Sequence, residues 1–149
     1  LIEERIRLYT HLATEKNIHF KINCQETSVV LFDTPRIEQV LDNLLTNAIK
    51  FSPVGGVIEI IMESGKGYIR VTITDEGPGI KSENLDDLFK PFKKIESDST
   101  KDEKGTGLGL AIAKKMIELH NGTLTFKPSK NQGASFSFKL PANPSSFQP

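Results

Sequence analysis

The chain has 149 residues, of which 37% are hydrophobic and 26% are charged, and its formal net charge is zero. This length favours one domain of ordinary size, and this composition excludes both a disordered chain and a membrane-embedded one. A net charge of zero argues against a general attraction to nucleic acid or anionic lipid, so we expect no nucleic-acid partner.

The single cysteine, Cys24, cannot form an internal disulfide, and no Cys/His zinc spacing is present. Because Cys24 lies in an alternating apolar run, we expect a buried structural thiol and not a reactive one. No run of 18 apolar residues occurs, and the first residues do not resemble a signal peptide. The chain does not begin with Met, so we expect it to be a piece of a longer protein.

The first half of the chain predicts two helices separated by strands. Apolar residues at roughly helical spacing predict a helix over 2–16, and the alternation at 18–22 predicts a strand. The β-branched run 28–32 predicts a second short strand. Asp33 and Pro35 then form a typical helix start, a capping residue followed by proline in the first turn.

The helix predicted over about 35–51 has two distinct faces. One is an apolar stripe made of Ile37, Leu41, Leu44 and Ala48. Asn43, Asn47 and Lys50 share a different face, one turn apart from each other. A solvated helix face is one interpretation of this second face. Asn is a poor helix former, however, which leaves a functional interpretation open.

The alternating runs 57–62 and 68–74 predict a β-hairpin, and the second run ends in Asp75, Gly77, Gly79 and Ile80. A carboxylate at a strand end followed by glycines can form the floor of a pocket. A simple turn that uses Asp, Gly and Pro for their dihedral angles is the alternative.

The polar stretch 93–104 follows a short helical pattern at 82–88, for which Ser82 is a plausible cap. A polar loop of this length is usually a functional lid or a disordered segment. Glycines then alternate at 105, 107 and 109, and a helix pattern starts at once. Glycines in front of a helix N-terminus suit a phosphate group, because the backbone approaches closely and unpaired N–H groups face it.

The chain ends with a predicted helix C-terminus at His120, Asn121 and Gly122, and with two predicted strands over 123–127 and 135–140. We expect one domain over residues 1–141 and a weakly ordered tail or linker over 142–149.

Four separated segments occur in one order: 43–51 with its two Asn, Asp75-Glu-Gly77-Pro-Gly79, Phe89-Lys-Pro-Phe92, and 105–110. Together they resemble the N, G1, F and G2 boxes of the catalytic ATP-binding domain of sensor histidine kinases, within the family of gyrase, Hsp90 and MutL. Residues 133–136 resemble the last Gly box. The resemblance covers residues 8–141 and implies an α+β fold. That fold is a two-layer α/β sandwich, with a mixed sheet of about five strands, three main helices on one face and a flexible ATP lid.

The resemblance also implies roles for individual residues. Asp75 would accept a hydrogen bond from the adenine amine, and Asn47 would coordinate Mg²⁺. Asn43 would face the phosphates or metal-bound water, and Lys50 would reach phosphate, which makes Asn43, Asn47 and Lys50 the catalytic set. Phe89 and Phe92 would pack on the core and anchor the lid. The remaining implied ATP contacts are Phe51, Gly77, Gly79, Ile80, Phe92, Lys94, Lys104, Gly105, Thr106, Gly107, Leu108, Gly109 and Leu110.

Two positions depart from relatives of this type. Hydrolysing relatives carry Glu as general base where this chain has Asn43, and an amide cannot take a proton. Many histidine kinases have Arg where this chain has Lys94, which keeps the charge but loses the bidentate fork. The first departure favours phosphoryl transfer to a protein over self-contained hydrolysis.

The expected function is therefore to bind Mg·ATP and to donate its γ-phosphate to a His on a separate dimerisation and phosphoacceptor domain. A response regulator would be an indirect partner. His11, His19 and His120 lack the acidic neighbour of an acceptor His, so we expect them to be structural or exposed. A nucleotide-sensing module without transfer, or a Ser-directed kinase or ATPase of the same family, are the alternatives. We expect a monomeric domain, a homodimeric parent and a cytoplasmic location, whether or not the parent is anchored in the inner membrane.

Overall fold

A computed structural model of the protein describes residues 1–25, 29–92, 108–129 and 133–142. The chain alternates between helices and strands, and ends in a pair of strands. In chain order, the elements are α1 (Ile2–Glu15), β1 (His19–Cys24), α2 (Thr34–Phe51), β2 (Val57–Gly65), β3 (Tyr68–Thr74), the 3₁₀ helix η1 (Ser82–Asp87), α3 (Gly109–Leu119), β4 (Thr123–Pro128) and β5 (Ala134–Pro141).

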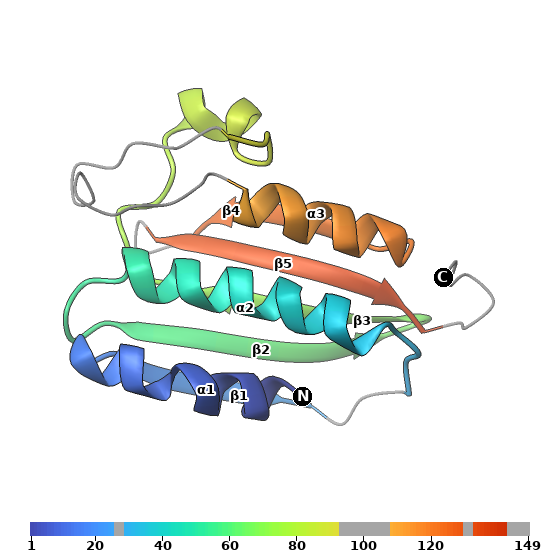
Figure 1. The fold of residues 1–149 in the computed structure, drawn as a ribbon, viewed down its shortest axis with the longest axis horizontal. Helices are drawn as coiled ribbons and strands as arrows, with labels where there is room; N and C mark the ends of the chain where they lie inside the picture. The colour runs from blue at the N-terminus through green and yellow to red at the C-terminus, as the bar shows by residue number, and fades with distance from the viewer. Residues whose placement is uncertain (26–28, 93–107, 130–132, 143–149) are drawn as a thin grey trace.

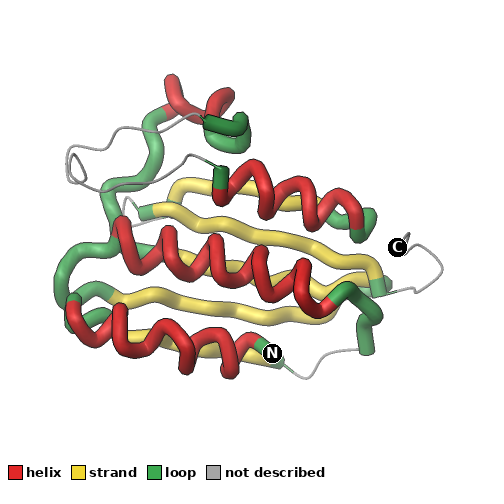
Figure 2. Tube along the Cα trace, viewed as in Figure 1, coloured by secondary structure: helices red, strands yellow, loops and turns green. Residues whose placement is uncertain are grey.

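The strands form one five-stranded mixed sheet in the order β1-β2-β3-β5-β4. β1 pairs with β2 in parallel, and the other three pairings are antiparallel. The three α-helices lie side by side on one face of this sheet, with α2 in the middle (Figure 1; Figure 2). The predicted α+β sandwich is therefore confirmed, and so is the hairpin of β2 and β3.

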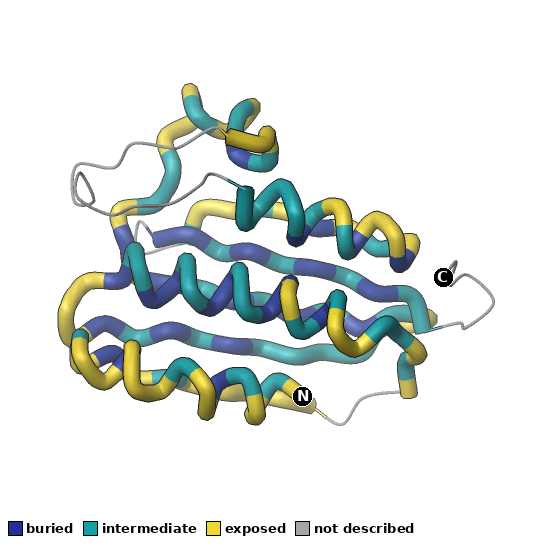
Figure 3. The backbone as a smooth tube through the Cα atoms, viewed as in Figure 1, coloured by how far each residue is buried: buried dark blue, intermediate teal, exposed yellow. Residues whose placement is uncertain are grey.

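The core lies between the sheet and the helices (Figure 3). Alternate strand residues point into it because successive side chains of a strand face opposite sides of the sheet. Those of the central strands are Ile58, Ile60, Ile69, Val71, Ile73, Phe136, Phe138 and Leu140, all less than 9% exposed. The residues between them are mostly polar, and hydroxyl pairs such as Thr72 with Ser137 (2.9 Å) cross the strands of that outer face.

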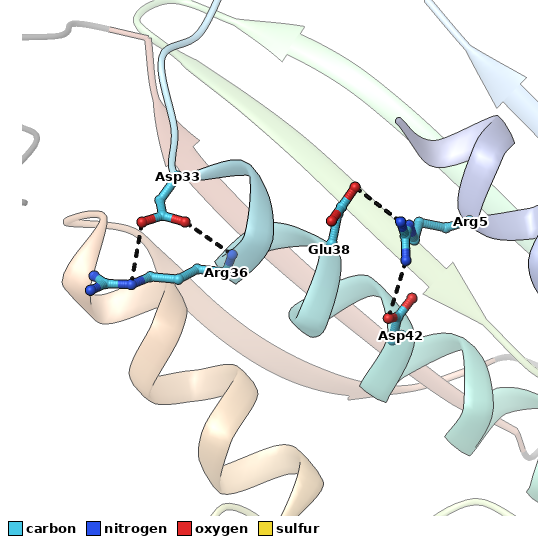
Figure 4. A network of polar contacts seen from close by, with 5 residues as sticks. All are labelled: Arg5, Asp33, Arg36, Glu38 and Asp42. Carbon is cyan, nitrogen blue, oxygen red and sulfur yellow. Dashed lines mark hydrogen bonds and ion pairs between the residues drawn. The ribbon is translucent and has the colours of Figure 1, made fainter.

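The central helix α2 is held at both ends by side chains. Asp33 is its N-cap and accepts a hydrogen bond from the Arg36 backbone N–H (3.1 Å), and Pro35 stands in the first turn, as predicted (Figure 4). At the other end, Lys16 Nζ donates to the carbonyl oxygens of Ile49 (2.8 Å) and Lys50 (3.0 Å). A cation there satisfies open carbonyls and complements the helix dipole.

The predicted strand over 28–32 is wrong for the part that the structure describes. Residues 29–32 join no strand pairing, although Val30 and Phe32 pack on the core while Val29 and Leu31 are exposed. This segment leads from the sheet layer to the start of α2 in the helix layer, so its backbone leaves the plane in which strands pair. The side-chain alternation is that of a strand, but the hydrogen bonds are not.

Two predictions about single residues are also wrong. Cys24 is exposed and not buried, because it ends the edge strand β1. Partial burial, with the carboxylate of Glu3 adding to it, raises the pKa of its thiol, so a reactive thiolate is not favoured either. Ser82 does not cap the short helix, since Lys81 occupies the N-cap position and the helix is 3₁₀.

No helix in the described ranges is long and apolar enough to cross a membrane.

Candidate functional site

Four segments that are far apart in the chain meet at one end of the molecule (Figure 1). They are the C-terminal half of α2, the loop that follows β3, the start of β5 and the start of α3. β3 pairs with β5, and α2 packs beside α3, so the sheet and the helix layer both contribute to this place. Most of the predicted site residues in the described ranges lie on these segments.

Asp75 is the most deeply buried acidic residue of the site, with 4% of its surface exposed. Its Oδ1 accepts hydrogen bonds from the backbone N–H groups of Gly77 (2.9 Å) and Ala134 (3.2 Å). Burial raises the pKa of this carboxyl group, and the two backbone hydrogen bonds oppose that effect. Because no described residue donates to Oδ2, that oxygen is left to accept a hydrogen bond from a ligand.

The loop after Asp75 is tightly packed against its neighbours. A Cβ on Gly77 would lie 2.5 Å from the carbonyl oxygen of Phe51, and a Cβ on Gly133 would overlap the carbonyl oxygen of Asp75. Gly79 has a φ of +73°, which residues with a Cβ rarely adopt. Glycine is thus required here because β3, β5 and α2 approach one another closely. The sequence did not indicate the close contact of Gly133 with Asp75.

The helix residues of the predicted catalytic set lie along one side of α2. The side-chain Nδ2 of Asn43 donates to the carbonyl oxygen of Gly109 (3.0 Å), the first residue of α3. Asn47, one turn further, is partly buried, and so is Lys50, whose Nζ lies 5.4 Å from the centre of the Phe51 ring. The predicted contact of Asn43 with phosphate or metal-bound water stays a prediction.

The N-terminus of α3 lies beside Asn43, and within the described part of the chain no side chain caps it. Its N-cap residue is Leu108, and the first helical hydrogen bond runs from the Ile112 N–H to the Leu108 carbonyl oxygen (2.9 Å). No described residue accepts a hydrogen bond from the N–H groups of the first turn, and such groups can bind a ligand. Leu110 is partly buried and packs against the core. Lys94, Lys104, Gly105, Thr106 and Gly107, together with the predicted lid over 93–104, lie outside the described residues.

The two phenylalanines predicted to anchor the lid behave differently. Phe89 packs against the core, with its ring edge-on to Phe136 at 6.4 Å between centres. Phe92 is 75% exposed and has a φ of +62°, so the prediction that it packs on the core is wrong. It follows Pro91 and is the last residue of the described segment 29–92. Ile80 is partly buried against the core.

The three histidines are exposed or structural, as predicted. His11 and His19 are exposed, whereas His120 is buried at the C-terminus of α3. His120 Nε2 accepts a hydrogen bond from the backbone N–H of Asp33 (3.0 Å), and Nδ1 lies 2.7 Å from the carbonyl oxygen of Met116. This imidazole therefore joins the end of α3 to the start of α2.

Sequence reasoning missed two side chains that shape the site. One is Lys16, which holds the C-terminus of α2 from the end of α1. The other is Glu76, whose Oε1 accepts a hydrogen bond from the backbone N–H of Val57 (2.6 Å) and ties the loop after β3 to β2. Both act on backbone groups distant in sequence, so no local pattern could have identified them.

The residues present suit a nucleotide with one bound divalent ion better than a metal cage. No group of three or more His, Cys, Asp or Glu that could hold a metal occurs in the described ranges. An amide oxygen such as that of Asn47 is a hard ligand, and Mg²⁺ usually takes few protein ligands and completes its shell with phosphates and water. Asp75 provides a hydrogen-bond acceptor in this site, and the first turn of α3 provides N–H groups that pair with no described residue.

Comparison with known proteins gives a consistent result. The family described as histidine kinase-, DNA gyrase B- and HSP90-like ATPase matches residues 32–144. Hybrid signal transduction histidine kinase D of Dictyostelium discoideum is 35% identical over 139 residues, which is 89% of this chain and 9% of that protein. The chain thus spans a small part of the length of such relatives.

Solved structures agree with this result. The catalytic domain of histidine kinase ThkA aligns with a TM-score of 0.84 and 34% identity, covering 96% of this chain and 92% of that one. Full-length ShkA in complex with AMPPNP aligns with a TM-score of 0.81 and 27% identity, covering 94% of this chain and 29% of that one. The similarity therefore extends over nearly the whole chain in sequence and in fold.

Proposed function

This chain belongs to the family of histidine kinase-, DNA gyrase B- and HSP90-like ATPases, and from that premise we propose that it binds Mg·ATP and donates the γ-phosphate to a histidine on a separate phosphoacceptor domain. One relative is named a hybrid signal transduction histidine kinase, and the similar full-length ShkA structure is a complex with AMPPNP, an analogue of ATP. The reaction would serve two-component signal transduction.

The observation that carries this proposal is the environment of Asp75. A carboxylate that is 4% exposed, with two backbone donors on Oδ1 and none from the described residues on Oδ2, is a costly feature for a fold to keep. A ligand donor such as the exocyclic amine of adenine would offset that cost. The hydrogen bond would be charge-assisted and would select adenine over a base with a carbonyl at that position.

The phosphate end of the site would lie between α2 and the start of α3. Open N–H groups at the first turn of α3 favour an anion, and Lys50 on α2 adds a positive charge on the same side as Asn47. Asn47 would hold Mg²⁺ through its amide oxygen. The ion would neutralise charge on the phosphate oxygens as the γ-phosphoryl group leaves ADP.

Transfer would rest on positioning and on charge, without a nucleophile from this chain. We expect none of the histidines to be the acceptor: His11 and His19 are not followed by an acidic residue, and the ring nitrogens of His120 contact Asp33 and Met116. The acceptor would come from the dimerisation and phosphoacceptor domain of a parent kinase in the cytoplasm. A response regulator would then receive the phosphate.

The test mixes the purified chain with a purified acceptor hairpin and ATP labelled at the γ-phosphate. We expect label on the hairpin that is lost in acid and kept in base, as phosphohistidine requires. An Asp75→Asn chain serves as the control and is expected to transfer little.

Three other outcomes would contradict the proposal in different ways. Nucleotide binding without any transfer would indicate a sensing module. Acid-stable label would indicate a Ser-directed kinase, and release of inorganic phosphate without labelled protein would indicate an ATPase.

A further inference from the structure

The carboxamide of Asn43 connects the two helices that border the candidate phosphate site. Its Nδ2 donates to the carbonyl oxygen of Gly109 at 3.0 Å, across 66 positions in the chain. A Cβ built on Gly109 would lie 3.7 Å from both Cγ and Oδ1 of Asn43, which is ordinary van der Waals contact. The amide plane therefore rests directly against the first residue of α3.

The start of α3 has no side-chain cap among the described residues, although Leu110 packs against the core. Leu108 offers no capping side chain, and helical hydrogen bonding begins only at the Ile112 N–H. A helix end that lacks a cap frays readily. The bond from Asn43 therefore fixes a turn that local sequence leaves weak.

The α2 side of this contact is firmly held. Thr46 Oγ1 donates to the carbonyl oxygens of Asp42 (2.7 Å) and Asn43 (3.3 Å), so the backbone beneath Asn43 is tied by a neighbouring side chain. The Asp42 carboxylate in turn meets Arg5 of α1 at 3.4 Å (Figure 4). Through Asn43, the firmly held helix α2 therefore fixes the position of the start of α3.

We propose that Asn43 is a positioning residue whose amide N–H holds the first turn of α3 against α2, and that it acts on bound nucleotide through the N–H groups of that turn. This inference rests on the proposed function, because it assigns a role within the same Mg·ATP site. In this role Asn43 does not touch the metal or the phosphate itself, and its effect on the nucleotide is indirect. A carboxylate at this position would set oxygen against the Gly109 carbonyl oxygen and could not make the bond.

The first experiment follows hydrogen exchange of the α3 amides in the chain without nucleotide. Asn43→Leu keeps the shape of Asn but has no donor, and it is expected to speed exchange at Ile112 and Ala113 about five-fold. Asn43→Gln keeps the donor and is expected to restore much of the protection. Asn23→Leu makes the same substitution on the exposed edge strand and should change neither amide. Should Asn43→Leu fail to fold, Asn43→Ala, which also lacks a donor, replaces it.

The second experiment compares the affinity for ADP and for AMPPNP in excess Mg²⁺ and in EDTA. A positioning role predicts a similar loss, about five-fold, for Asn43→Leu under all four conditions, with partial rescue by Asn43→Gln. A loss confined to samples with Mg²⁺, or to AMPPNP, would overturn the inference in favour of direct contact with the metal or the γ-phosphate.

The two experiments separate this inference from the proposed function. If the unsubstituted chain binds neither nucleotide, the proposed function fails, while the exchange of Ile112 and Ala113 still decides whether Asn43 holds α3. Unchanged exchange in Asn43→Leu would overturn the positioning role even if nucleotide binding is intact.

Discussion

At the scale of single residues, Asp75 is a buried acidic side chain whose burial opposes the stability of the fold. Burial raises the pKa of its carboxyl group, with Gly77 and Ala134 opposing that shift. The folded state therefore disfavours the charged form that a ligand amine would need. Because the pKa of this carboxyl group is higher in the folded chain than in the unfolded chain, its burial lowers the free energy of unfolding at pH values above the unfolded pKa.

Asp75→Asn should separate binding from stability. The Asn Oδ1 still accepts from Gly77 and Ala134, so at pH 7 we expect a melting temperature equal to or above that of the unsubstituted chain. The Asn Nδ2 then stands in place of Oδ2 and would face the adenine amine as a second donor, so the proposed hydrogen bond would be lost and the affinity for ADP should fall ten- to a hundred-fold, or about 1.5–3 kcal/mol. Thermal melting and calorimetric titration measure the two effects.

The pH dependence provides the control for that substitution. A carboxyl group with a raised folded pKa contributes stability that is fully present below the unfolded pKa, about 3.9, and is lost as pH rises through the folded value. The advantage of the Asn variant should therefore shrink as the pH is lowered towards 4. A variant that melts several degrees lower at pH 7 would show instead that the charge stabilises the loop.

Residue-level prediction succeeded where the chemistry is local. Asp33 was identified as a cap because an acidic side chain before Pro35 serves the nearest N–H groups, and the Arg36 N–H is the one it accepts from. Cys24 and Phe92 were misplaced because their exposure depends on what lies beside them in space. Alternation and motif membership do not reveal that β1 is an edge strand or that Phe92 points away from the core.

At the scale of elements, α1 is attached to α2 by a charged contact as well as by apolar packing. Arg5 Nη2 lies 3.0 Å from Glu38 Oε1 and Nη1 lies 3.4 Å from Asp42 Oδ2, and the Arg5 side chain is 17% exposed (Figure 4). Partial burial strengthens such contacts, and removal of the cation leaves two carboxylates facing each other.

Arg5→Met keeps most of the apolar stem and removes the charge. We expect the free energy of unfolding, measured with urea, to fall by about 2 kcal/mol at low salt and by less at high salt. Combining it with Glu38→Gln and Asp42→Asn should recover part of the loss, because the uncompensated carboxylates are then absent. Lys21→Gln removes the cation of the exposed Lys21–Glu59 pair and should change stability by less than about 0.5 kcal/mol. Equal effects of Arg5→Met and Lys21→Gln would contradict this account.

Element prediction was reliable for helices and strands with long, strongly periodic patterns. The helical spacing of apolar residues in α2 correctly predicted the buried stripe that contains Leu41, Leu44 and Ala48. The alternation of apolar residues in β3 correctly predicted which of its side chains face the core. The strand predicted over 28–32 failed although its side chains alternate between core and solvent. Alternation reports which side chains are buried, whereas a strand also requires a partner backbone, which Val30 and Phe32 do not have.

At the scale of the whole molecule, the candidate site belongs to no single element. Asp75 directly follows β3, Ala134 begins β5, Asn47 lies on α2, and Gly109 begins α3. The sequence placed the site residues through resemblance to a family, since the motifs appear in order. It did not indicate the contacts that bring the segments together, such as Gly133 beneath Asp75 or His120 beside Asp33, because these connect positions 58 to 87 apart.

A site shared by sheet and helices predicts that nucleotide stabilises the whole domain in one transition. At a free concentration of 100 times the dissociation constant, a ligand that binds only the folded state adds about 2.7 kcal/mol. For a domain of this size we expect a rise in melting temperature of about 5–10 °C with Mg·ATP. If Asp75 accepts from the adenine amine as proposed, Mg·GTP at the same concentration should raise it much less, because guanine would present a carbonyl at that position. Melting curves followed by circular dichroism measure both shifts. Equal shifts for the two nucleotides would show that Asp75 does not select the base. A second melting transition whose temperature does not change with nucleotide would show that the domain does not unfold as one unit.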